Sequence, residues 1–114
     1  MKRAAIFLFA IAIYCALGVA LAWPDAALAL PCVTMQRLAQ EHSNDMARRG
    51  SLDHRGFADR ANRGARAENV AFASSKDEAM RRWHNSPQHA ANMRLPGCRG
   101  IANSGRYWTM EIGE

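Results

Sequence analysis

Three side chains of this sequence could do chemistry together: the imidazoles of His54 and His89 and the carboxylate of Glu68. Two neutral imidazoles and one carboxylate are a suitable ligand set for zinc or a similar divalent cation with an open coordination position. The distance between the two histidines in the sequence gives little support for a metal site, because no His-x-x-x-His pattern places both of them on one helix face. Only the tertiary fold can unite the three residues. We expect them to line one solvent-accessible cleft, with Ser86 at its edge.

A serine hydrolase is a second chemical interpretation, because Ser86 lies close to His89 in the sequence. However, Ser86-Pro87 is typical of a helix start, with serine at the N-cap and proline at the first helical position. We therefore expect the Ser86 hydroxyl to bind backbone amides, and the chain lacks the Gly-x-Ser-x-Gly motif of many hydrolases. His42 lies on an apolar helical stripe, where we expect a structural core residue.

The elements that must position these residues follow from hydrophobic periodicity. A helix is predicted from Cys32 to Gly50, with Thr34 as its N-cap and an apolar stripe of Met35, Leu38, Ala39, His42 and Met46. His54 then falls in a loop over 50–64 that has room for one helical turn. A strand is predicted over 67–73, followed by a helix that begins at a Ser75–Glu78 capping box and continues through residue 83. A further helix is predicted over 86–94. The chain then forms a hairpin whose strands are 100–103 and 106–112, with the turn at 104–105. Strands and helices without regular βαβ alternation indicate an α+β layered domain.

The first 22 residues are typical of a signal peptide. Lys2 and Arg3 precede an apolar run from Ala4 to Ala22 that ends in the small-x-small pattern read by signal peptidase. A second such pattern places possible cleavage as late as residue 29. We therefore expect a secreted or periplasmic protein whose mature part contains one small domain, residues 32–114, and no permanent membrane span.

Export also bears on the cysteines and on the charge. Two cysteines remain after cleavage, Cys32 and Cys98, and an even pair in an oxidising compartment usually forms a disulfide. The full chain has a formal net charge of +5, which falls to +3 without Lys2 and Arg3. The arginines are spread along the chain instead of forming a basic stripe with interleaved aromatic residues, which argues against a nucleic-acid partner.

An ordered set of motifs resembles the CAP domain (cysteine-rich secretory protein, antigen 5 and pathogenesis-related 1 proteins), in particular its compact bacterial SCP-like branch. The resemblance covers about residues 35–113. Its motifs are His42-Ser43-x-x-Met46-Ala47, Leu52-x-His54, Phe57-x-x-Arg60, Ala67-Glu68-Asn69-Val70, Trp83-x-x-Ser86-Pro87-x-His89-x-x-Asn92-Met93 and Tyr107-Trp108-Thr109.

The resemblance implies an α-β-α sandwich with a small three-stranded antiparallel sheet, truncated at its N-terminus because the usual first helix is missing. It also implies a central cleft that gathers two histidines and two acids. His54, Glu68 and His89 match three of these four positions, and Ser86 stands where the fourth acid usually lies.

The leading functional hypothesis is an exported, non-enzymatic binding module whose cleft holds a small lipid-like ligand or a divalent metal such as zinc. Lipid or sterol binding, metal binding and interaction with an envelope or host component are themes that the resemblance implies. One alternative is a secreted metal-assisted hydrolase or protease, with Glu68 as base and His54 and His89 as metal ligands. A further alternative is a structural domain that acts through a partner protein.

Overall fold

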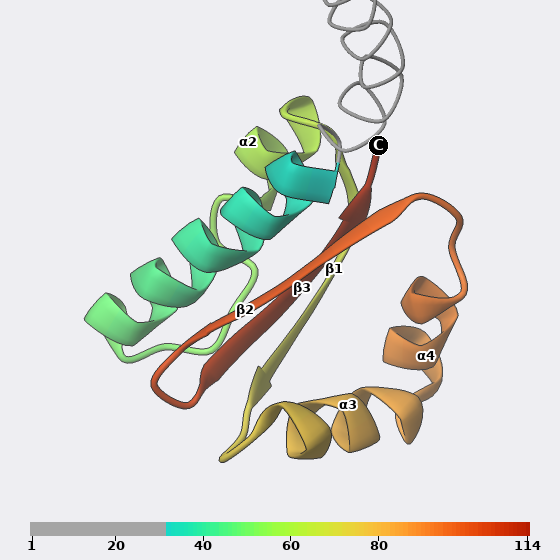
Figure 1. The fold of residues 1–114 in the computed structure, drawn as a ribbon. Coiled ribbons are helices and arrows are strands. Elements are labelled where there is room, and N and C mark those ends of the chain that lie inside the picture. Colours follow the sequence, from blue (N-terminus) through green and yellow to red (C-terminus); the bar gives the residue numbers. More distant parts are fainter. Residues whose placement is uncertain (1–31) are drawn as a thin grey trace, which may run out of the picture. The chain divides into compact units, whose positions relative to one another are not determined.

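The computed structural model describes residues 32–114, and the expected signal peptide lies outside these residues. The described chain is an α+β domain with a three-stranded antiparallel sheet in the order β1-β3-β2. The strands are β1 (Ala65–Phe72), β2 (Cys98–Ser104) and β3 (Tyr107–Gly113). The sheet lies between two helical layers, one formed by the helix over 32–49 and α2 (Phe57–Asn62), the other by α3 (Lys76–His84) and α4 (Pro87–Met93) (Figure 1). This agrees with the predicted fold class.

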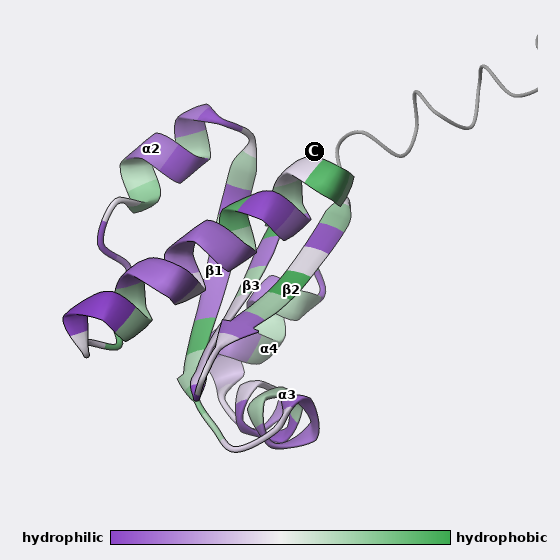
Figure 2. Ribbon diagram, turned by 60° about the vertical axis from the view of Figure 1, so that its left-hand side comes forward, coloured by the Kyte–Doolittle hydropathy of each residue, from purple (hydrophilic) through white to green (hydrophobic). Residues whose placement is uncertain are grey.

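The helix over 32–49, called the long helix below, packs through the predicted apolar stripe. Met35, Leu38, Ala39 and Met46 are fully buried, and His42 is 2% exposed. Hydrophilic residues dominate the side of this helix that is turned to the viewer in Figure 2. The helix ends as predicted at Gly50, whose φ of 63° is the left-handed conformation that glycine adopts readily. The prediction that Thr34 is the N-cap of this helix is wrong, because residues 32 and 33 are already helical.

The expected capping box is half formed at the start of α3. The Ser75 hydroxyl accepts a hydrogen bond from the backbone N–H of Glu78 at 3.1 Å, as predicted. The Glu78 carboxylate accepts from the backbone N–H and the hydroxyl of Ser74, instead of returning to Ser75. These bonds and the Arg82 guanidinium at 2.8 Å hold the pKa of Glu78 down to about 2.

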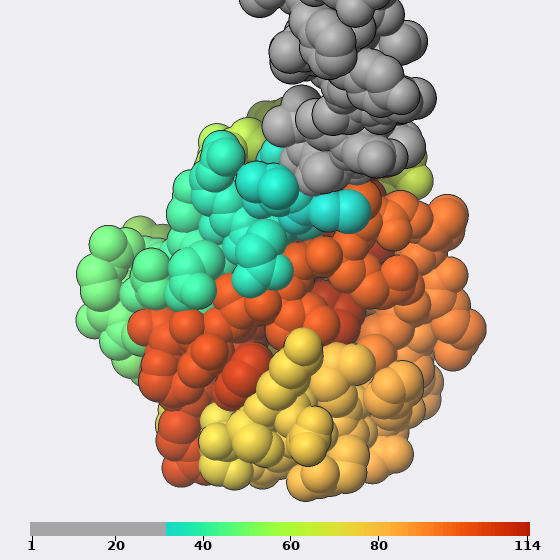
Figure 3. Space-filling view, in the orientation of Figure 1, coloured from blue at the N-terminus to red at the C-terminus, as the bar shows by residue number. Residues whose placement is uncertain are grey.

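The long helix approaches β2 very closely. A Cβ at Gly100 would overlap the backbone of Met35 and Gln36, so only glycine allows this approach. The Gln36 amide donates to the carbonyl of Ile101 at 2.7 Å and accepts from its N–H at 3.0 Å, which satisfies backbone groups of an edge strand. The space-filling view shows residues of β2 between the two helical layers (Figure 3).

The predicted disulfide is present and fastens this same contact. Cys32 at the start of the described chain is bonded to Cys98 at the start of β2, with their Cα atoms 4.9 Å apart. The apolar core on the other face of the sheet centres on Trp83, Met110 and Ile112, all at most 1% exposed. Among residues 32–114, no helix has both the length and the apolar character that crossing a membrane requires.

Candidate functional site

Glu68 lies at the centre of a buried polar cluster. Its strand neighbours alternate between the two faces of the sheet, and Glu68 faces the layer of the long helix and α2. Its side chain is 1% exposed, and Arg60 from α2 binds both carboxylate oxygens, at 2.6 Å from Nε and 3.0 Å from Nη2. His54 Nδ1 lies 2.8 Å from Oε1. Burial alone would raise the pKa of Glu68, but hydrogen bonds from Glu111, Arg60 and His54 outweigh it and lower this pKa.

Glu111 is the acid that sequence reasoning missed. It is the cross-strand partner of Glu68 on β3 and is completely buried. Neither of its oxygens has a well-aligned hydrogen-bond donor among the described residues, although Arg60 Nε lies 3.1 Å from Oε1. Burial and the hydrogen bond to Glu68 raise the pKa of Glu111 to about 10. Glu111 is therefore a neutral acid at pH 7, whose hydroxyl can donate to the Glu68 carboxylate.

His42 has the structural role expected of it. Its Nε2 donates to the backbone carbonyl of Asp53 at 2.7 Å and lies 3.5 Å from Glu68 Oε1. This contact connects the long helix to the loop that carries His54. Nδ1 of His42 is buried and has no hydrogen-bond partner among residues 32–114.

His54 is more accessible than the acid that holds it, since its side chain is 53% exposed. Because Glu68 is ionised, His54 donates through Nδ1 and its Nε2 is left as the second functional atom of the ring. His54, Glu68, Phe57 and Asn92 are among the residues that line a cavity of about 310 Å³. The structure therefore joins two of the three predicted site residues directly.

His89 is bound to Ser86, on the other side of β1. Its Nδ1 lies 2.8 Å from the Ser86 hydroxyl. Ser86 occupies the N-cap of α4 as predicted, but its hydroxyl makes no capping hydrogen bond, so the expected engagement with backbone amides is wrong. Burial lowers the pKa of His89, and the nearby charge of His54 lowers it further. His89 is consequently a neutral imidazole at pH 7.

Two asparagines fix the backbone of α4 against β1. Asn69 donates to the carbonyl of His89 at 3.0 Å, and Asn92 donates to the Asn69 side-chain oxygen at 3.0 Å. Asn69 is completely buried and directly follows Glu68, so the two side chains point to opposite faces of the sheet. Glu68 binds the ring of His54 on one face, and Asn69 binds the backbone of His89 on the other.

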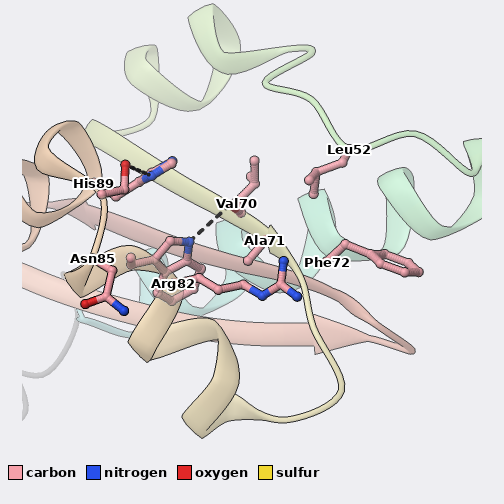
Figure 4. Close-up of a pocket in the computed structure, with 9 residues that line it drawn as sticks. Leu52, Val70, Ala71, Phe72, Arg82, Asn85 and His89 are labelled. Carbon is pink, nitrogen blue, oxygen red and sulfur yellow. Dashed lines mark hydrogen bonds between the residues drawn. The ribbon is translucent and has the colours of Figure 1, made fainter.

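A second and larger cavity, of about 460 Å³, contains the Ser86–His89 pair. We call it the β1 cleft. It is lined by Leu52, Val70, Ala71, Phe72, Arg82, Trp83, Asn85, Ser86 and His89 (Figure 4). On β1, Asn69 alone separates its lining residues from those of the His54 cavity, so the two cavities are neighbours along the strand. Of the four residues expected in one cleft, His54 and Glu68 line the first of these neighbouring cavities, and Ser86 and His89 line the second.

The residues expected to hold zinc are engaged with one another or with other side chains. Both oxygens of Glu68 accept from Arg60, and one also accepts from His54. Within residues 32–114, no group of three or more His, Cys, Asp or Glu side chains is arranged to hold a metal ion. His54, Glu68 and His89 thus do not form a zinc ligand set in this arrangement.

Comparisons with known proteins gave no significant match to this chain among protein-family models, curated proteins or solved structures.

Proposed function

We propose that this protein is an exported, CAP-like binding module whose β1 cleft takes a small amphipathic ligand with an apolar chain and an anionic head. The observation that supports the proposal most strongly is the composition of the cleft. It combines an apolar wall with an arginine and a hydrogen-bonded Ser–His pair. Its volume of about 460 Å³ lies within the range of about 300–1,000 Å³ that small-molecule sites have.

The apolar wall is unusually open to solvent for side chains of this type. Leu52 is 46% exposed and Phe72 is 39% exposed, although both are large hydrophobic residues. They lie at the same end of the cleft (Figure 4), and Val70 and the buried Trp83 continue the wall. An apolar chain that covers Leu52 and Phe72 would remove this surface from water, which is the main driving force for such binding.

The polar side chains of the cleft favour an anionic head. With His89 neutral, Arg82 is the only positively charged side chain that lines the described cavity, and no Asp or Glu lines it. Arg82 pairs with Glu78 at 2.8 Å through Nη2, and its side chain is 57% exposed, so further guanidinium donors face solvent. Arg106 stacks over the Phe72 ring at 4.6 Å and adds positive charge beside the apolar wall.

Export is part of the same proposal. The disulfide between Cys32 and Cys98 is of the kind that forms and persists in oxidising compartments. It supports a secreted or periplasmic location, as does the signal-like N-terminal sequence.

The test is calorimetric titration of the exported protein with decanoate, a carboxylate with a medium-length apolar chain. We expect Phe72→Ser and Leu52→Ser each to weaken binding by about five-fold, because each removes roughly 1 kcal/mol of apolar contact from a half-exposed wall. Val33→Ser is the matched control, since Val33 is 51% exposed but lies on the long helix. Equal weakening by all three changes, or no binding by the wild type, would contradict the proposal.

A further inference from the structure

The hydroxyl of Ser86 is directed to an imidazole instead of to the backbone. A serine at an N-cap ordinarily accepts from an amide of the first helical turn, and Ser86 makes no such bond. Its oxygen instead lies 2.8 Å from His89 Nδ1, within the reach of a general base that takes a proton from a hydroxyl. Both side chains line the β1 cleft, so a bound ligand can meet them.

We propose that Ser86 and His89 are a nucleophile and its base, and that they cleave carboxylic esters bound in the β1 cleft through an acyl-Ser86 intermediate. The inference rests on the proposed function for the cleft itself, and adds a reaction to it. Neither the Glu68 cluster nor a metal takes part.

The first half-reaction moves one proton and exchanges one bond. The Ser86 oxygen attacks the ester carbonyl carbon while His89 Nδ1 accepts the hydroxyl proton. The tetrahedral intermediate collapses with cleavage of the bond to the alkoxy oxygen, and His89 gives its proton to the departing alcohol. In the second half-reaction, His89 takes a proton from water, the hydroxide attacks acyl-Ser86, and the proton returns to the serine oxygen. One ester and one water become one acid and one alcohol.

The surroundings of the pair suit this chemistry. The partly buried His89 is a neutral base at pH 7, because burial lowers its pKa. Its backbone is fixed by the bond from Asn69, so the ring starts from a defined position. Arg82 lines the same cavity and adds positive charge to it. Leu52, Val70 and Phe72 provide an apolar wall for the acyl chain.

Among residues 32–114, no carboxylate is bonded to the second nitrogen of His89, and the nearby acid Glu68 binds His54 instead. We therefore expect slow turnover, and the intermediate is best detected by covalent labelling. Diethyl p-nitrophenyl phosphate is a suitable probe, because a serine nucleophile displaces p-nitrophenol and keeps the diethylphosphoryl group.

The experiment incubates the exported protein with this probe and locates the added mass by peptide mapping. We expect the label on Ser86, no label at this position in Ser86→Ala, and at least a hundred-fold slower labelling in His89→Gln, the size of effect that a general base typically has. His84→Gln is the matched control, because His84 is an exposed histidine at the end of α3, and it should label at the wild-type rate. Turnover of p-nitrophenyl butyrate should follow the same order.

Titration with decanoate separates this inference from the proposed function. Decanoate binding by Ser86→Ala together with lost labelling supports both. Binding by a wild type that is not labelled at Ser86, or is labelled equally fast in His89→Gln, overturns the Ser86–His89 reaction and leaves the binding module intact. Absence of both binding and labelling overturns both.

Discussion

Replacing Glu111 by glutamine should stabilise the protein at neutral and alkaline pH, although it removes a residue from the centre of the fold. Glu111 is completely buried, its pKa is raised to about 10, and its ordinary value of 4.5 applies to the unfolded chain. Between these values the folded protein binds one proton more than the unfolded chain at this position. The stability contribution of the neutral acid is therefore complete below about pH 4.5 and is lost as the pH rises towards 10.

The magnitude follows from this difference in bound protons. Each pH unit inside the window lowers the free energy of unfolding by about 1.4 kcal/mol, so the loss between pH 5 and pH 8 is up to about 4 kcal/mol. Glutamine has a similar shape, stays neutral at every pH and keeps an N–H donor for the Glu68 carboxylate. The stability of Glu111→Gln relative to wild type should therefore increase by up to about 4 kcal/mol over this range, a large share of what a small domain has.

Urea unfolding followed by tryptophan fluorescence at pH 5, 6, 7 and 8 measures this difference. Subtraction of the wild-type values removes the contributions of titrating groups that do not contact Glu111, which both proteins share. Glu41→Gln is the control, because Glu41 forms an exposed ion pair with Arg63 at 2.8 Å and should change stability by less than about 1 kcal/mol. A Glu111→Gln difference that stays constant or shrinks as the pH rises would mean that Glu111 is ionised in the folded protein, and the reasoning would be wrong.

Three further changes test the fold and the cluster. Cys98→Ser should lower the free energy of unfolding by roughly 4 kcal/mol, because the disulfide closes a loop between residues 66 apart; unchanged thermal unfolding would contradict this. Gly100→Ala should cost about 1–3 kcal/mol in the same assay, since its Cβ would overlap the backbone of the long helix, and an unchanged unfolding midpoint would rule the contact out. Arg60→Met should cost about 3–5 kcal/mol at pH 7, because it leaves the buried Glu68 carboxylate without its main partner, and a loss below 1 kcal/mol in urea unfolding would argue against the ion pair.

Much of the architecture could be predicted because it depends on local sequence. The stripe of the long helix, the Ser75 cap of α3 and the proline-led start of α4 each follow from residues within a few positions of one another. The pairing of Cys32 with Cys98 needed only their number and the expected compartment.

The polar cluster could not be predicted in the same way, because it depends on strand register and on long-range packing. Glu111 faces Glu68 only because β1 and β3 pair antiparallel in one register, and a shift by one residue would turn Glu111 to the other face. His54 and His89 come to β1 from different helical layers, so their relative position depends on how both layers pack on the sheet. The one available signal for Arg60 was its place in the Phe57-x-x-Arg60 motif, which names the residue but not its partner.

Ser86 shows where local reasoning failed at the site itself. Its position at an N-cap was predicted correctly. However, its hydroxyl forms a hydrogen bond with the ring of His89, three residues later, instead of with a backbone amide. Local patterns therefore predicted the backbone conformation at Ser86 correctly. They did not predict the partner of its hydroxyl, because both a backbone amide and the His89 ring are within reach.

The most direct test of the binding proposal is residue-by-residue NMR of the ¹⁵N-labelled exported protein during titration with decanoate. We predict saturable shifts of the amide signals of residues 70–72, 82, 83, 85, 86 and 89, which line the β1 cleft, and little change along the long helix. Shifts confined to the long helix and β2, or none at saturating decanoate, would contradict the account.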